Sequence, residues 1–495
     1  MEVVAITSGG PSIPEKLASQ TDLNFVSVKN LDDLENAWLE QGDCFNRLSR
    51  LEKRFGSKPL NEILIADRRI GNGYIYGGEL PPTPLIKMSE DSELVRRILA
   101  GSVETVADTI DNFKPEAVVT LGIASCITHS FAAVCAHKNI PFLTLGATRI
   151  GDRYIVDNDS KCKLATLREE FKLTLKDPSR LDQHFEEAKQ FIDEFRNRPM
   201  PPEYNSTYQT SFYLKQSAMG AGFQLARGVR ALYRGLTRPN LRRDLRTPSR
   251  FGRGWWRGKV ALRERYRLRY GPFLPRGGLP DTHYAYFPLH ITPEASTMTW
   301  SPMFTDQIAA IEAISKSLPP SMNLVVKEHL PMVGQRPTEF YERLIRMPKV
   351  VLASPFENSF DLIAKAKLVA VITGTAGWEA ILMGVPALVL GQVSYLDLDD
   401  GFVHCSDFEK LSDAIEEALD LKPVRDERLT HFVGTIFKLS FRLPSDILWS
   451  LPSKARIADL QSEIDTIAER TLALIPRINP EPPHSVEDEK LESSN

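Results

Sequence analysis

Short apolar runs alternate with longer stretches of helical spacing along most of the sequence, and no other feature restricts the possible folds as strongly. In the first 170 residues we expect buried strands over residues 3–7, 24–28, 62–66, 117–121 and 142–145. Helical stretches separate these runs, over residues 31–57, 92–112 and 127–138. Strands that alternate with helices favour a parallel sheet covered by helices on both faces.

A second series of the same kind begins near residue 283. Its expected strands cover residues 284–289, 324–327, 350–353, 368–372 and 387–390, and its expected helices cover residues 303–317, 338–346, 359–366 and 376–383. We therefore predict an α/β fold in which two doubly wound parallel-sheet domains face a cleft. Open α/β sheets bind their ligands at the carboxyl ends of the strands, so polar residues at these ends are the first candidates for a site.

The two series divide the chain into five parts. We expect an N-terminal α/β domain, a helical basic insertion, a C-terminal α/β domain, C-terminal helices and a disordered tail, over residues 1–170, 171–275, 276–425, 426–477 and 478–495. The tail is acidic and rich in proline, as is typical of disorder. The first residues lack the basic and apolar regions of a signal peptide, and no window reaches the ~18 apolar residues of a membrane span. A cytoplasmic location is therefore expected.

Several enzyme classes are excluded by motifs that the sequence lacks. There is no GxxxxGKS/T loop, no GxSxG turn and no HExxH pair. The five cysteines form no CxxC pair, so we predict neither a disulfide framework nor a zinc site, and no metal or cofactor. Gly9 and Gly10 follow the first strand in SGGPS, which does not fit GxGxxG; they are predicted to let a substrate or a loop approach the backbone at the cleft. Charged groups at residues 67–69 and 149–153 also lie near strand ends.

The segment VAVITGTAGWEAILMGVPALVLG, residues 369–391, is the most informative part of the sequence. An apolar strand ends at Ile372, and Thr373, Gly374 and Thr375 form a turn into a helix. Small residues and a helix N-terminus suit a phosphate or diphosphate. Glu379 lies one helical turn further on. A glycine-rich turn with a purely structural role is an equally good interpretation of this segment by itself.

The segment LVVKEHLP, residues 324–331, places three polar side chains at the end of a strand. Lys327, Glu328 and His329 are well placed to hold a nucleotide. Taken alone, the segment favours a simpler interpretation, a loop histidine with satisfied hydrogen bonds beside an exposed Lys–Glu pair.

A third strand end, in YFPLHITPEAS over residues 286–296, carries His290 and Glu294. Two prolines stiffen this loop, which would present both side chains to the cleft. Glu294 is the candidate general base or sugar-hydroxyl ligand. His290 is either a cleft residue or a structural residue bonded to the backbone.

A strongly basic run precedes the second series of strands. Between Arg227 and Arg269 there are 15 Lys or Arg residues and two acids, a local charge of +13 in a chain of net charge −3. Arg227, Arg230, Arg234 and Arg238 would form one stripe of a helix, and Trp255 and Trp256 lie among further arginines. Arginine with interleaved tryptophan is typical of a surface at the headgroup layer of anionic lipid. A nucleic acid, a polyanionic glycan or plain solvation are the alternatives, and no recognisable nucleic-acid module surrounds the run.

Together, YFPLHITPE, VVKEHLP and VITGTAGWEAILMGVPALVLG resemble the bacterial capsule polysaccharide biosynthesis family, a GT-B-like group of glycosyltransferases that includes capsule Kdo transferases. The resemblance covers mainly residues 283–395, with a weaker match in RIGDRYIVDND, residues 149–159. It implies that His329 contacts the nucleotide, that Thr373, Gly374 and Thr375 hold the donor phosphate, and that Glu379 lies next to the donor.

The resemblance implies a peripheral enzyme at the inner face of the cytoplasmic membrane that builds a surface polysaccharide. Its expected partners are a nucleotide-sugar donor, foremost a CMP-linked acid sugar such as Kdo, a lipid-linked saccharide acceptor and other polysaccharide-assembly proteins. The nucleotide sugar is a substrate, so no cofactor is expected. Two alternatives remain: an enzyme similar to UDP-sugar 2-epimerases, and a non-catalytic assembly protein that binds glycan or lipid.

Overall fold

The structure is a computed structural model that describes most of the chain: residues 2–8, 15, 17, 19, 24–159, 161, 163–200, 245–246, 248–444 and 460–475. Three predictions from the sequence lie outside the described residues. They concern Gly9 and Gly10, the arginine stripe of residues 227–238 and the tail over residues 478–495.

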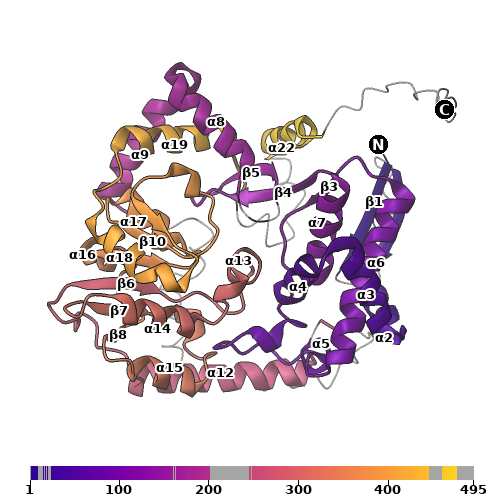
Figure 1. Cartoon of the computed structure of the whole chain (residues 1–495), viewed down its shortest axis with the longest axis horizontal. Helices are drawn as coiled ribbons and strands as arrows, with labels where there is room; N and C mark the ends of the chain where they lie inside the picture. The colour runs from indigo at the N-terminus through magenta and orange to yellow at the C-terminus, as the bar shows by residue number, and fades with distance from the viewer. Residues whose placement is uncertain are drawn as a thin grey trace, which may run out of the picture.

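A six-stranded parallel sheet organises the C-terminal half (Figure 1). Its strands are β6 (Tyr284–Pro288), β7 (Asn323–Lys327), β8 (Val350–Ala353), β9 (Leu368–Val371), β10 (Ala387–Val389) and β11 (Phe402–His404). The five predicted strands of this half are confirmed, and β11 is additional. Runs such as Leu368–Val371 are apolar at every position because both faces of a parallel sheet are covered.

Helices on the two faces of this sheet form two separate cores. Along β6, Tyr284 and Tyr286 point into one core, and Ala285 and Phe287 into the other, as the two-residue period of a strand requires. The helices of the half are α13 (Ala295–Trp300), α14 (Gln307–Ser317), α15 (Thr338–Ile345), α16 (Ser359–Lys365), α17 (Thr375–Leu382) and α18 (Leu411–Asp420). The doubly wound architecture predicted for this half is therefore present.

The strand order fixes where a ligand would bind. The sheet runs β11-β10-β9-β6-β7-β8, so the chain moves from β6 outward to β8 and then returns to the other side of β6 with β9. The direction of winding reverses between β6 and β9. In open α/β sheets, the ligand lies at this switch point, outside the carboxyl ends of the strands.

The N-terminal half is also α/β, with two smaller sheets. β1 (Glu2–Thr7) and β2 (Asn24–Asn30) pair in parallel, and a second sheet has the order β12-β5-β4-β3. Its strands are β3 (Val118–Thr120), β4 (Phe142–Ala147), β5 (Arg153–Asn158) and β12 (Phe441–Arg442). Only β3 and β4 are parallel, while β5 and β12 are antiparallel to their neighbours.

One predicted strand of the N-terminal half is wrong. Residues 62–66 belong to the helix α4 (Ser57–Ala66), whose buried residues Leu60, Ile63 and Ala66 follow a helical spacing. The other helices of this half are α2 (Leu31–Glu40), α3 (Cys44–Phe55), α5 (Pro84–Met88), α6 (Ser92–Phe113) and α7 (Cys126–Lys138). They surround a core that includes Trp38, Ile98 and Val103.

The chain crosses between the halves more than once. The helices α8 (Ala165–Lys176) and α9 (His184–Asn197) follow the N-terminal sheet but pack with α19 (Asp426–Leu439) beside the C-terminal sheet. β12 then returns to pair with β5, and α22 (Gln461–Ala473) lies beside them.

The long helix α12 (Arg250–Tyr270) runs along the lower edge of the molecule in Figure 1. Lys259 and Arg263 form ion pairs with Glu79 of the N-terminal half, at 2.9 and 2.6 Å. Arg267 is buried and donates to the backbone oxygen of Val333 in the C-terminal half (2.7 Å). Among the described residues, no helix has the length and apolar character needed to cross a membrane.

Candidate functional site

Two of the predicted motifs meet at the switch point. His290 follows β6 and Gly374 follows β9, and a Cβ atom placed on Gly374 would lie 3.3 Å from the His290 ring. The imidazole therefore lies directly against the backbone of the turn, and a side chain in place of Gly374 would press against the ring. His290 is buried, and within the described part of the chain its Nε2 atom has no hydrogen-bond partner. A buried ring nitrogen without a partner is available to a ligand.

The turn before α17 offers further polar groups. Thr373 is buried, and its hydroxyl has no partner among the residues described. Gly374 is the N-cap of α17, and Thr375 is the first residue of the helix, so the free backbone N–H groups of its first turn begin here. A hydroxyl, N–H groups and the positive end of a helix dipole together suit a phosphate group.

Lys327 places a cation beside this turn. It is the last residue of β7, and its Nζ atom donates a hydrogen bond to Ser359 at 3.2 Å. Burial lowers the pKa of Lys327, although the nearby carboxylates of Glu328 and Glu379 act in the opposite direction. No ion pair joins Lys327 to a carboxylate of the described chain. An anionic ligand could therefore supply the charge partner that this ammonium lacks.

Glu379 lies one turn into α17 and is buried. Burial raises the pKa of its carboxyl to about 7, while the charges of Arg149 and Lys327 and a hydrogen bond from Thr375 act in the opposite direction. Arg149 belongs to the N-terminal half, in the turn between β4 and β5, where its backbone has the left-handed φ of 67°. Arg149, whose backbone is strained, thus places its guanidinium charge from the N-terminal half near Glu379 in the C-terminal half.

A phosphodiester bound at this edge of the sheet should bind more weakly as pH rises through 7. A bound phosphodiester keeps its charge over this range and disfavours the ionised form of Glu379, so the ligand prefers the protonated carboxyl. We expect the dissociation constant measured by calorimetry to increase several-fold between pH 6 and pH 8 in the native protein. Glu379→Gln should flatten this profile. An equally steep profile in the Gln variant would show that another group controls the pH dependence.

His329 and Glu294 complete the polar rim. Burial and the charge of Lys327 lower the pKa of His329 to about 4, so the imidazole is neutral at pH 7 and can donate and accept hydrogen bonds. Glu294 is the N-cap of α13, and its Oε2 atom is 3.8 Å from Nδ1 of His290. Burial would raise the pKa of Glu294, but contacts with His290 and Ser296 lower it overall, so an anionic base is present at neutral pH.

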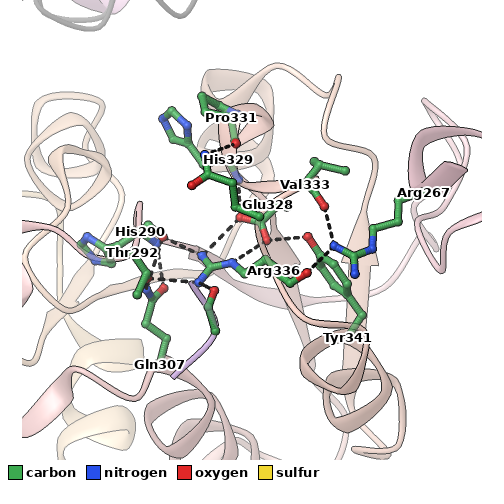
Figure 2. A network of polar contacts seen from close by, with 12 residues as sticks. Arg267, His290, Thr292, Gln307, Glu328, His329, Pro331, Val333, Arg336 and Tyr341 are labelled. Atoms are coloured by element: carbon green, nitrogen blue, oxygen red, sulfur yellow. Dashed lines mark hydrogen bonds and ion pairs between the residues drawn. The ribbon is translucent and has the colours of Figure 1, made fainter. Parts of the chain in front are cut away.

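Glu328 has a different position from the one the sequence suggests. Its carboxylate points into the protein and is fully buried in an ion pair with Arg336, with Nε and Oε2 2.9 Å apart (Figure 2). Tyr341 donates to the same oxygen at 2.8 Å, and the backbone N–H of His329 donates to the other at 2.8 Å. Both oxygens are therefore occupied within the protein, and Glu328 fixes the backbone of His329 instead of facing the switch point.

Arg336 also fixes the second histidine loop. Its guanidinium donates to the backbone oxygen of His290 (2.6 Å) and to the hydroxyl of Thr292 (3.1 Å), as Figure 2 shows. Gln307 accepts from the His290 backbone N–H at 2.8 Å and donates to Thr292 at 2.6 Å. A further bond from Arg336 to the oxygen of Gly77 (2.7 Å) ties in the N-terminal half. These residues position the site without facing it.

The structure thus brings most predicted site residues to one edge of the sheet: His290, Glu294, Lys327, His329, Thr373, Gly374, Thr375 and Glu379. Trp255 and Trp256 lie apart from this edge, on α12. The sequence analysis noted Arg149 only as a charged residue near a strand end, and it gave no role to Arg336 or Gln307. No local pattern marks these two residues, since their partners are distant in sequence.

No family model and no curated protein matches the sequence. Among solved structures, Thermosulfurimonas dismutans KpsC, a beta Kdo 2,7 transferase, is 14% identical with a TM-score of 0.34, over 67% of this chain and 80% of that one. The UDP-GlcNAc 2-epimerase of Methanocaldococcus jannaschii is 12% identical with a TM-score of 0.25, over 69% and 81%. S. aureus MnaA with UDP is 11% identical with a TM-score of 0.23, over 88% and 91%.

A Kdo transferase, the activity that the sequence motifs resemble, is thus one of these similar structures. Because the TM-scores are low, the chemistry of the site has to carry the functional argument.

Proposed function

We propose that this protein is a glycosyltransferase that takes its sugar from a nucleotide sugar. The observation that carries the proposal is the set of groups at the switch point. A buried threonine hydroxyl and a buried histidine nitrogen, both without partners among the described residues, lie where the turn into α17 begins, and Lys327 and Arg149 place positive charge nearby. This set matches a phosphate that acts as the leaving group of a sugar.

The residues of the site support a mechanism based mainly on electrostatics. As the glycosidic bond breaks, negative charge grows on the leaving phosphate, and the α17 N-terminus and Lys327 stabilise it. Neutral His329 supplies a hydrogen bond to the nucleotide without adding a charge. Glu294, anionic at neutral pH, is placed to accept a proton from the incoming hydroxyl.

The finer identity of the substrates is part of the proposal. The sequence resemblance favours a CMP-linked acid sugar such as Kdo as donor and a lipid-linked saccharide as acceptor, in capsule or surface polysaccharide synthesis. The acceptor would lie on the side of the N-terminal half, which contributes Arg149 to the site. Such an acceptor would require the enzyme to work at the inner face of the cytoplasmic membrane, with other assembly proteins nearby.

The direct test incubates the full chain with separate CMP-sugars and UDP-sugars and measures nucleotide release, with and without a saccharide acceptor. Acceptor-dependent release of one nucleotide is expected. Conversion of a UDP-sugar into its 2-epimer would instead identify an epimerase. Binding of glycan without any turnover would identify a non-catalytic assembly protein.

We expect His329→Ala and Thr375→Ala each to weaken nucleotide binding without unfolding the protein. Each change removes a group placed to bond the nucleotide, and hydrogen bonds to a charged phosphate contribute roughly 1.5–3 kcal/mol. The affinity for CMP or UDP should therefore fall by one to two orders of magnitude in calorimetry. Ser359→Ala, which removes a hydroxyl that contacts Lys327 and Tyr286 but is not predicted to touch the nucleotide, is the control. Unchanged affinity in both test variants would remove the donor site from this edge of the sheet.

A further inference from the structure

A stripe of large apolar side chains on α12 is exposed to solvent. Its members are large side chains between 65% and 73% exposed: Phe251, Trp255, Leu262, Tyr266 and Tyr270. At 100° per residue, these five positions fall within one arc of about 100° on the helix. Lys259 and Arg269 are the basic residues that fall within the same arc. Single exposed apolar residues are common on proteins, but five on one face of one helix form a patch that calls for a partner.

The other contacts of α12 fix the orientation of this stripe. Arg267 is buried against the C-terminal half, and Lys259 and Arg263 bind Glu79 of the N-terminal half. The backbone of Gly334 lies so close to Val260 that an added Cβ would be 2.3 Å from the Val260 oxygen. Val260 and Arg267 therefore face the protein, and the centre of the stripe lies about 120° around the helix from them and faces outward.

The C-terminal end of the stripe borders a hollow of about 490 Å³. From α12 and the residues after it, the hollow is lined by Leu262, Arg263, Tyr266, Arg267, Tyr270, Gly271 and Pro272, and from α15 by Thr338, Tyr341, Glu342 and Ile345. Aliphatic groups and ring faces predominate among these residues. Such a hollow can take up part of a hydrocarbon chain.

The charge of α12 indicates which partner fits the stripe. The helix contains eight Lys or Arg residues and one acid, Glu264. The exposed basic residues include Arg265, which lies beside the stripe, and Arg269, which lies within its arc, both at the same end as the hollow. A basic helix with aromatic and aliphatic residues on one face matches the headgroup layer of an anionic bilayer. A nucleic acid would also attract arginine and stack on aromatic rings, but it has no hydrocarbon chain to fill the hollow, where Leu262, Pro272 and Ile345 lie among tyrosines.

We propose that α12 lies flat in the surface of an anionic phospholipid membrane, with its stripe from Phe251 to Tyr270 inserted and its arginines among the headgroups. This inference deepens the proposed function, since a lipid-linked acceptor would then be presented along the edge of the molecule that joins the two halves. It also extends the predicted membrane contact beyond Trp255 to Leu262, Tyr266 and Tyr270.

The test measures co-sedimentation of the full chain with vesicles of phosphatidylcholine alone and with 30% phosphatidylglycerol, a mole fraction of roughly one anionic lipid in three. The native chain should pellet preferentially with anionic vesicles, and less as salt increases. Leu262→Gln with Tyr266→Gln should reduce the partition coefficient about tenfold or more. The control pair, Phe45→Gln with Leu472→Gln, removes equally exposed apolar residues elsewhere and should pellet like the native chain.

A charge variant separates the two components of binding. Arg265→Gln with Arg269→Gln should reduce binding to anionic vesicles by roughly thirtyfold, since each basic residue contributes about 1 kcal/mol. Equal pelleting with both vesicle types, or native pelleting by the Leu262/Tyr266 variant, would overturn the proposal. Binding to a single-stranded oligonucleotide in place of vesicles would assign the stripe to nucleic acid. Nucleotide affinity, measured in the same variants, should not change, so a failure here is distinct from a failure of the donor site.

Discussion

Arg336→Met should lower the free energy of unfolding by about 3–5 kcal/mol, the largest stability effect that we expect for a single substitution in this protein. The change leaves the fully buried carboxylate of Glu328 without its cation. It also removes the donors to the backbone oxygens of His290 and Gly77, which come from different halves of the chain. Methionine retains most of the side-chain volume, so the loss is electrostatic and not a cavity. Urea denaturation followed by circular dichroism measures it.

The matched control is Arg343→Met. Arg343 is 45% exposed and lies 3.6 Å from Glu312, so its pair should contribute less than about 1 kcal/mol. In a second step, Glu328→Gln combined with Arg336→Met should recover part of the loss, because the unpaired charge is then absent. If Arg336→Met is no more destabilising than the control, the buried pair does not hold the two histidine loops together.

The fold of the C-terminal half could be predicted because each of its strands is apolar at nearly every position. In β9, for example, the run begins at Leu368 and stays buried to Val371, and a glycine-rich turn follows. The N-terminal half was harder to predict for two physical reasons. A short apolar run such as residues 62–66 fits a buried helix as well as a strand. The two-residue strand β12 pairs with β5 almost 290 residues earlier, a contact that no local pattern encodes.

In the candidate site, too, some residues could be predicted from the sequence and others could not. Residues at or just beyond strand ends, such as Lys327 and His290, could be found because parallel strands present their carboxyl ends at one edge. The sequence could not show which polar residue at such an end faces the ligand. Lys327 and Glu328 are adjacent, yet Glu328 turns inward because Arg336, eight residues later, provides its partner. Whether a polar side chain at a strand end can face a ligand or instead holds a neighbouring loop in position therefore depends on its tertiary contacts and not on its residue type.

Lys327→Met should abolish most nucleotide binding and leave the fold at least as stable. Burial already lowers the pKa of this lysine, which means that the native fold bears a cost for keeping it charged at neutral pH. Methionine keeps the aliphatic stem and removes that cost. If a phosphate is the missing charge partner, loss of the cation should weaken binding of CMP or UDP about thirtyfold or more, as for truncation of a buried hydrogen-bonded charge pair.

A lysine at the opposite edge of the sheet provides the control for this change. Lys349 precedes β8 and donates to the backbone oxygen of Leu318 at 2.6 Å, and burial lowers its pKa as well. Lys349→Met should therefore leave nucleotide affinity unchanged in calorimetry, while Lys327→Met loses it with an unchanged or higher urea midpoint. Equal affinities in the two variants would place the phosphate elsewhere. If burial of the charged Lys327 side chain lowers the stability of the fold, its replacement by methionine should not destabilise the protein. Loss of both nucleotide affinity and stability would therefore make Lys327 a structural residue.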